Sequence, residues 1–157
     1  MSAVVSDLMD KLITEIPTVT GYSTKKRIPN PYVLADTNIN SHKKLAQGWG
    51  LMMGGSNINP FNMKSVNADQ GFTIVLTRQI TGAEEQPEIL DREVKNIQTD
   101  LHELITHLSS NTVWSYTPGV IDVNISSTDP IEYFNDEKFR MISTSANFVA
   151  KIEEDLD

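Results

Sequence analysis

Two histidines near the end of an apolar-periodic segment come nearest, in this sequence, to a known catalytic pattern. His102-Glu103-Leu104-Ile105-Thr106-His107 resembles the helix of a zinc protease, in which a glutamate accompanies two histidines four positions apart. Here the histidines are five positions apart, which separates the imidazoles by about 140° around a helix. They cannot bind one ion from the same face, so we predict no metal site. Two exposed histidines in the last turns of a helix, where positive charge is favoured, explain the pattern.

Other patterns give no support for catalysis or for a bound cofactor. Gly48, Gly50, Gly54 and Gly55 lack the preceding strand, the following helix and the Gly-Lys-Ser/Thr ending of a phosphate-binding loop, so they are read as turns beside a short strand. No serine has the flanking glycines of a nucleophile elbow. The absence of cysteine excludes disulfides, thiolate metal sites and thiol nucleophiles. We therefore predict no catalytic residue, no cofactor and no enzymatic activity.

The elements that would position such residues must come from a chain of 157 residues with 39% hydrophobic content, enough for one core. We predict a single domain over residues 1–157. The formal net charge of −8 argues against a protein that binds nucleic acid through its phosphates, because such binding depends on clustered lysine and arginine. No stretch approaches the roughly 18 apolar residues of a membrane span, so no membrane partner is expected. The acidic residues at 153–157 are predicted to form a solvated tail.

The first half of the chain predicts a helix, an arm and two strands. Apolar residues at spacings of three and four predict a helix over residues 3–16, which Pro17 closes. Residues 17–36 hold three prolines and a glycine, and predict an extended arm. A short helix over 37–47, a short strand over 49–53 and a loop over 54–67 are expected next. Alternating apolar and polar residues then predict a strand from Phe72, with the alternation broken at Val75 and Arg78.

The second half predicts one long helix and two strands. Glutamates and Pro87 open the helix, and an apolar stripe follows it to Leu108 at steps of four and three. Residues 120–127 are predicted to be a strand whose buried face carries Ile121, Val123 and Ile125. Residues 139–152 form the last strand, and Asp129-Pro130 connects the two. The fold class is α+β, with an antiparallel sheet of about four strands and the long helix packed on it.

The arm is the first candidate for an interaction surface, because long segments without structure of their own serve contact in compact domains. Its basic run 25–27 is either a solubilising patch or an ionic contact to an acidic neighbouring subunit. The residues assigned to a subunit interface are Lys25, Lys26, Arg27, Ile28, Pro29, Pro31 and Tyr32.

One family has a similar series of segments. The run Lys25-Lys26-Arg27-Ile28-Pro29-Asn30-Pro31-Tyr32, a short helix, Gly48-Trp49-Gly50, then Phe72-Thr73-Ile74-Val75-Leu76-Thr77-Arg78 and a long helix resembles the tail terminator (tail completion) proteins of long-tailed bacteriophages of siphophage type. The resemblance covers most of the chain in the order of its elements. It concerns a scaffold and carries over no catalytic residue.

The resemblance implies a structural protein of the virion that is assembled in the host cytoplasm. Such proteins form a homohexameric ring at the head-proximal end of the tail tube, end tube polymerisation and join the tail to head-completion (stopper) proteins. DNA then passes through the lumen without specific binding, which an acidic wall favours. Loops 54–70 and 80–86 would meet the tube or the head. Their candidate contact residues are Ser56, Asn57, Asn59, Phe61, Glu84 and Glu85.

Two alternatives to a terminator remain open at this point. One is another virion part, either a head–tail adaptor or a tail tube subunit, which would differ in stoichiometry and partner. The other is a small metal-dependent enzyme or ligand-binding domain that uses His42, His102 or His107 with nearby carboxylates.

Overall fold

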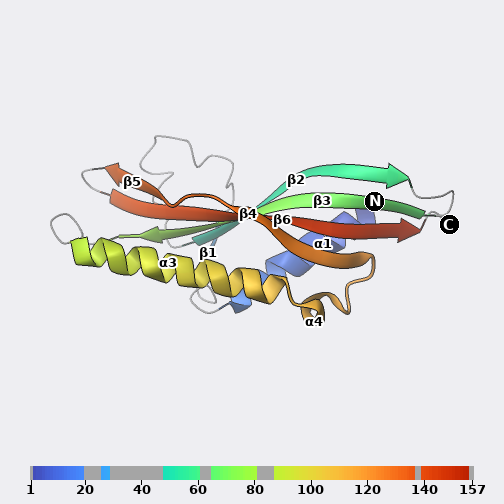
Figure 1. Ribbon diagram of the computed structural model, residues 1–157, viewed down its shortest axis with the longest axis horizontal. Helices are drawn as coiled ribbons and strands as arrows, with labels where there is room; N and C mark the ends of the chain where they lie inside the picture. Colours follow the sequence, from blue (N-terminus) through green and yellow to red (C-terminus); the bar gives the residue numbers. More distant parts are fainter. Residues whose placement is uncertain are drawn as a thin grey trace.

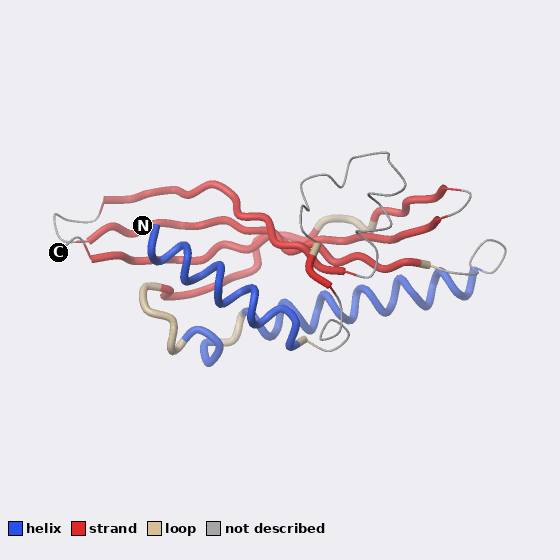
Figure 2. The backbone as a smooth tube through the Cα atoms, turned by 180° about the vertical axis from the view of Figure 1, so that it is seen from behind, coloured by secondary structure: helices blue, strands red, loops and turns tan. Residues whose placement is uncertain are grey.

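Two helices lie on the same face of a long, twisted sheet, as Figures 1 and 2 show from opposite sides. The computed structural model describes residues 2–19, 26–28, 48–60, 65–80, 87–136 and 139–155. The predicted α+β class, with helices packed on an antiparallel sheet, is confirmed. None of the described helices combines the length and apolar character needed to cross a membrane.

Helix α1, Ser2–Glu15, confirms the helix predicted for residues 3–16. Its buried stripe includes Leu8 and Leu12, both fully buried against the sheet. A 3-10 turn, η1 (Ile16–Thr18), follows and contains Pro17, the residue that was predicted to end the helix. Proline has no backbone N–H to continue the α-helical ladder, so the chain turns away at this point.

Helix α3, Pro87–Leu108, is the predicted long amphipathic helix, and Pro87 occupies its first position as expected. The second half of its apolar stripe is buried, while Leu90 and Val94 are half-buried. The buried members are Ile97, Leu101, Leu104 and Leu108. A short helix that was not predicted, α4 (Asn111–Trp114), follows. The Trp114 indole donates a 2.7 Å hydrogen bond to the carbonyl oxygen of Leu108, which satisfies a free acceptor at the end of α3.

The sheet has the order β1-β2-β3-β6-β4, with β5 also paired to β6. All of its pairings are antiparallel except the parallel pair β1 and β2. The described residues thus form six strands where about four were expected. Their bounds are β1 Lys26–Arg27, β2 Gly48–Pro60, β3 Ser65–Gln79, β4 Val120–Thr128, β5 Glu132–Asp136 and β6 Phe139–Asp155.

The loop predicted for residues 54–67 is wrong, because β2 and β3 occupy this stretch except for residues 61–64, which lie outside the described residues. A bulge in β2 accommodates the glycines. The buried Gln70 amide closes it, donating to the carbonyl oxygens of Gly54 (2.8 Å) and Gly71 (2.9 Å). A β-carbon at Gly54 would lie 3.2 Å from the Gly71 oxygen, so this close approach of two backbones favours glycine.

The prediction for the second pair of strands was partly wrong. The buried face of β6 is as expected, but in β4 only Val123 of the predicted face is buried. Ile121 is exposed because it is the extra residue of a bulge between Val120 and Asp122. Ile125 pairs with the buried Phe148 and is 38% exposed at the open edge of the sheet. Asp129-Pro130 does not connect β4 to β6. It leads into β5, which pairs with the first residues of β6, so β4 and β5 follow one another along the same edge of β6.

The predicted arm and tail are both partly integrated into the domain. Within residues 17–36 the structure describes 17–19 and 26–28, and Val19 and Ile28 are both buried there. The short helix predicted for 37–47 lies outside the described residues. The predicted acidic tail is wrong up to residue 155, because β6 continues to Asp155 and pairs there with β3.

Candidate functional site

The basic segment that was expected to contact a neighbour begins as a short edge strand. Arg27 is exposed on β1, and its guanidinium carbon lies 5.8 Å from the centre of the Trp49 ring, within the range of a cation–π contact. Ile28, however, is 1% exposed, and its N–H donates to the Trp49 carbonyl oxygen at 2.7 Å. Its side chain is therefore buried within the subunit, and the prediction that Ile28 faces a neighbour is wrong. Arg27 is accessible for such a contact.

The remaining predicted contact residues fall into three groups. Ser56 and Asn57 are exposed, but they lie on β2 and not on a loop, and Asn59 belongs to the same strand. The structure describes the backbone of Lys26 but not its side chain. The residues that lie outside the described ranges are Lys25, Pro29, Pro31, Tyr32, Phe61, Glu84 and Glu85.

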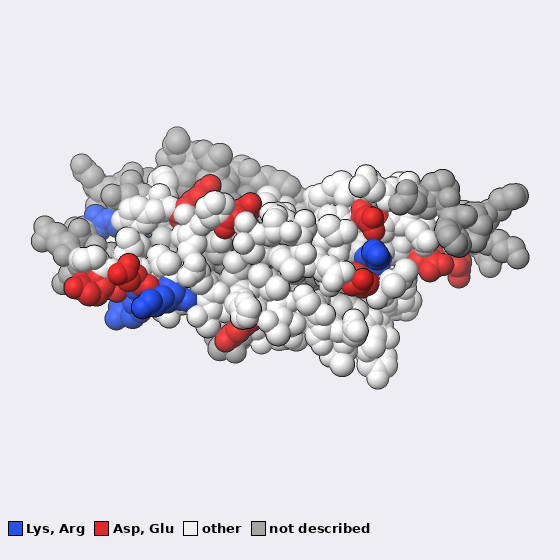
Figure 3. Space-filling model, viewed as in Figure 1, with Lys and Arg blue, Asp and Glu red and all other residues white. Residues whose placement is uncertain are grey.

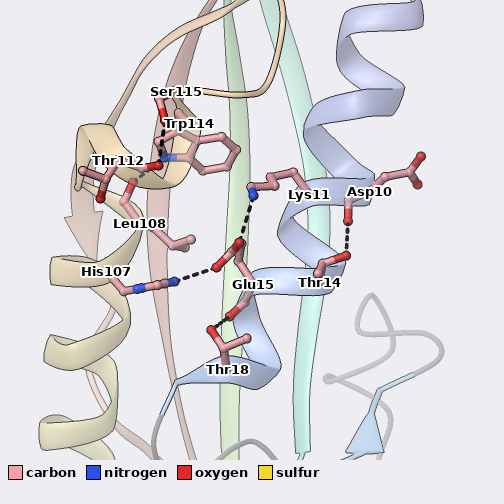
Figure 4. A network of polar contacts seen from close by, with 10 residues as sticks. All are labelled: Asp10, Lys11, Thr14, Glu15, Thr18, His107, Leu108, Thr112, Trp114 and Ser115. Atoms are coloured by element: carbon pink, nitrogen blue, oxygen red, sulfur yellow. Dashed lines mark hydrogen bonds and ion pairs between the residues drawn. The ribbon is translucent and has the colours of Figure 1, made fainter.

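The histidine pair does not converge on a site. His102 is exposed, whereas His107 lies 2.8 Å from Glu15 and joins α3 to α1 (Figure 4). Lys11 lies 2.9 Å from the same carboxylate, one helical turn earlier. The hydrogen bond with His107 is the main cause of a lowered Glu15 pKa, opposed by burial and reinforced by Lys11. Within the described ranges, no three His, Asp or Glu side chains are grouped so that they could hold a metal ion.

The sheet face opposite α1 and α3 carries a polar ladder of hydrogen-bonded side chains, most of them uncharged. The Thr73 hydroxyl donates to Asn147 at 2.6 Å, and the Asn147 amide donates to Ser127 at 3.1 Å. The Ser145 hydroxyl donates to the carboxylate of Asp129, at the junction of β4 and β5. Apart from Ser127, these side chains border a depression of about 350 Å³. Because they satisfy one another, we interpret them as cross-strand links between β3, β6 and β4.

The charged side chains on the side of the molecule seen in Figure 3 gather toward its two ends, and the middle carries few of them.

One charged group on the helix-covered face of the sheet explains the break in the predicted β3 pattern. Arg78 reaches α3, with its Nε 2.9 Å from Glu93 and its Nη1 2.8 Å from Asp100. These ion pairs offset the cost of burying the Arg78 charge beside the core. Because they join β3 to α3, their role is to hold α3 against the sheet.

The feature best suited to assembly is the pair of strands at the two edges of the sheet. In the described part of the chain, β4 pairs only with β6, and residues 52–60 of β2 pair only with β3. A strand edge presents N–H and C=O groups that another strand can pair with. The domain therefore offers two different edges, β2 and β4, on opposite sides of one sheet.

Comparison of the sequence with models of known protein families gives no match, and comparison with curated proteins gives none either.

Proposed function

We propose that this chain is a structural virion protein that assembles with copies of itself into a ring at the head-proximal end of a phage tail tube. The ring ends tube polymerisation and joins the tail to head-completion proteins. The proposal builds on the resemblance of the sequence to tail terminators. The observation that carries it from the structure is the pair of unlike sheet edges.

Unlike edges matter because a ring is a head-to-tail assembly. Each subunit in a ring must present two different surfaces, one for each neighbour, whereas a two-fold dimer needs only one self-complementary surface. β2 and β4 supply two such surfaces on opposite sides of the sheet. This requirement favours a homo-oligomer of the proposed hexameric kind.

The charge of the chain fits a conduit for DNA. A formal net charge of −8 repels phosphates, so a duplex passing through the ring would slide and not bind. The polar ladder on the sheet face away from the helices is built mainly from hydroxyl and amide groups, which carry no charge. We propose that the tube protein and the head-completion protein contact the two rims of the ring, and that DNA crosses its lumen.

The experiment is to image tailed particles that carry a tagged copy of this chain. A terminator places the label at a single position, the joint between head and tail. Removal of the gene product should give tails of abnormal length that fail to join heads. A label repeated along the tail would instead assign the chain to the tube, and absence of the label from particles would refute a virion role.

A second measurement addresses the enzyme alternative. If the purified chain turned over a compound and His107→Ala abolished that turnover, the structural assignment would fail. Because His107 pairs with Glu15, the variant must first be shown to fold, for which far-UV circular dichroism is sufficient.

A further inference from the structure

The two open edges run in directions that allow them to pair with each other. β2 is antiparallel to β3, β3 to β6, and β6 to β4, so β2 and β4 run in opposite directions within one subunit. A second copy placed beside the first by a small rotation, as in a ring, keeps nearly the same orientation. Its β2 would then lie antiparallel to β4 of the first copy, which is the pairing that the rest of the sheet already uses.

The two edges also lie at the same level of the sheet. Ile58 of β2 pairs with Ala68, Ala68 with Ile152, and Ile152 with Val120 of β4, so these four residues form one row across the sheet. The row lies on the face that the helices cover, and its two middle members are 3% and 1% exposed. A neighbouring subunit at the same level would extend this apolar row and not interrupt it.

Exposed isoleucines lie on both open edges of the sheet. Ile58 on β2 is 58% exposed, and Ile121 and Ile125 on β4 are 57% and 38% exposed. They account for three of the five large hydrophobic residues that are exposed in the described part of the chain. Edge strands usually carry charged residues or proline that prevent pairing, and exposed isoleucine does the opposite.

We infer that β4 of one subunit pairs antiparallel with residues 52–60 of β2 in the next copy, so that the sheets join into a continuous band around the ring. Ile58 of the neighbour then lies level with Val120, the member of the apolar row on β4, and close to the adjacent Ile121. This inference rests on the proposed ring and adds the surface through which it closes.

The size of the contact predicts how the ring behaves. β4 has nine residues, and at about 3.3 Å per residue it is about 30 Å long. With a sheet and its side chains about 10 Å thick, one edge contact buries about 600 Å² in total, about half of the smallest area that a stable pair of proteins buries. An isolated pair of subunits is therefore weak, and a closed ring, in which each subunit makes two contacts, is favoured over open fragments.

The test uses cysteine cross-linking, for which the chain is well suited because it contains no cysteine. The full-length double variant Ile58→Cys/Ile121→Cys is compared with each single variant at high protein concentration, under mild oxidation or with a short bis-maleimide. Both positions are more than half exposed, so the substitutions should leave the fold intact. A matched control pairs Ile58→Cys with Glu103→Cys, an exposed position on α3.

The expected result is a ladder of covalent oligomers from the double variant, with no dimers from either single variant and no ladder from the control. Single variants stay monomeric because like positions do not meet in a head-to-tail contact. Dimers from Ile121→Cys alone, or absence of the ladder, would overturn the inference. Native mass spectrometry of the same samples separates this failure from failure of the ring: a ring without the ladder leaves the proposed function standing and removes only the β2–β4 contact.

Discussion

The ion pairs between Arg78 and α3 give the most quantitative prediction for this protein. Arg78 makes contacts of 2.9 and 2.8 Å with Glu93 and Asp100, and the three side chains are 24%, 18% and 12% exposed. We consider Asp100→Asn, which preserves the shape of the side chain and one oxygen acceptor but removes the charge. The substitution leaves the arginine with a weaker, neutral partner at its most buried contact.

The magnitude follows from where this pair lies between two limits. Breaking a fully buried ion pair costs about 3–5 kcal/mol, whereas an exposed pair contributes about 0–1 kcal/mol. Arg78 is about one quarter exposed, so water screens part of the loss. We expect Asp100→Asn to lower the free energy of unfolding by about 2 kcal/mol, or the Tm by about 4–8 °C for a domain of this size.

Urea unfolding followed by circular dichroism measures this change directly, and thermal unfolding provides an independent value. Glu103→Gln is the matched control, because Glu103 is an exposed carboxylate on the same helix and its loss should change the free energy of unfolding by less than about 0.5 kcal/mol. If Asp100→Asn unfolded at the same urea concentration as the control, the ion pairs would not hold α3 to the sheet and the reasoning would be refuted.

Three further predictions concern the helix contacts and one turn. The Glu15 pKa lies below its ordinary value of 4.5, so the stabilisation from its bond to His107 is present above pH 4.5 and is lost as the pH falls through the lowered pKa. Glu15→Gln should therefore be less stable than the native chain at pH 7, and the difference should vanish in acid. Urea unfolding midpoints measured across this pH range test the prediction. Gly119 has a φ of +83°, and an added β-carbon would lie 2.8 Å from a backbone oxygen of β6. Gly119→Ala should therefore lower the free energy of unfolding in urea by at least about 1–2 kcal/mol. Gly55→Ala is the control, because a β-carbon there would have no atom within 4 Å and should cause no clash. Trp114→Phe should cost about 1 kcal/mol or more in the same assay, because it leaves a buried carbonyl at the end of α3 without its donor.

The sequence by itself determined both long helices and most of the two central strands. Helical hydrogen bonds join residues four apart, so the stripe that ends at Leu108 and the early Pro87 contain nearly all the information that α3 needs. The fully buried apolar positions of β6 were equally readable from their period of two. The break of the β3 pattern at Arg78 was visible too, but its meaning depends on carboxylates of α3 that only folding brings near.

The tertiary structure alone decided the register of the edges and therefore the candidate assembly surface. A glycine- and asparagine-rich stretch became strand β2 because β3 and the Gln70 amide satisfy its backbone groups, and neither partner is local in sequence. A bulge in β4 turned Ile121 outward, although the alternation predicted a buried face, and Ile125 stays partly exposed at the open edge although it pairs with the buried Phe148. Strand pairing joins residues far apart along the chain, so which edge stays open, and which isoleucines remain exposed on it, is fixed only when the whole sheet has formed.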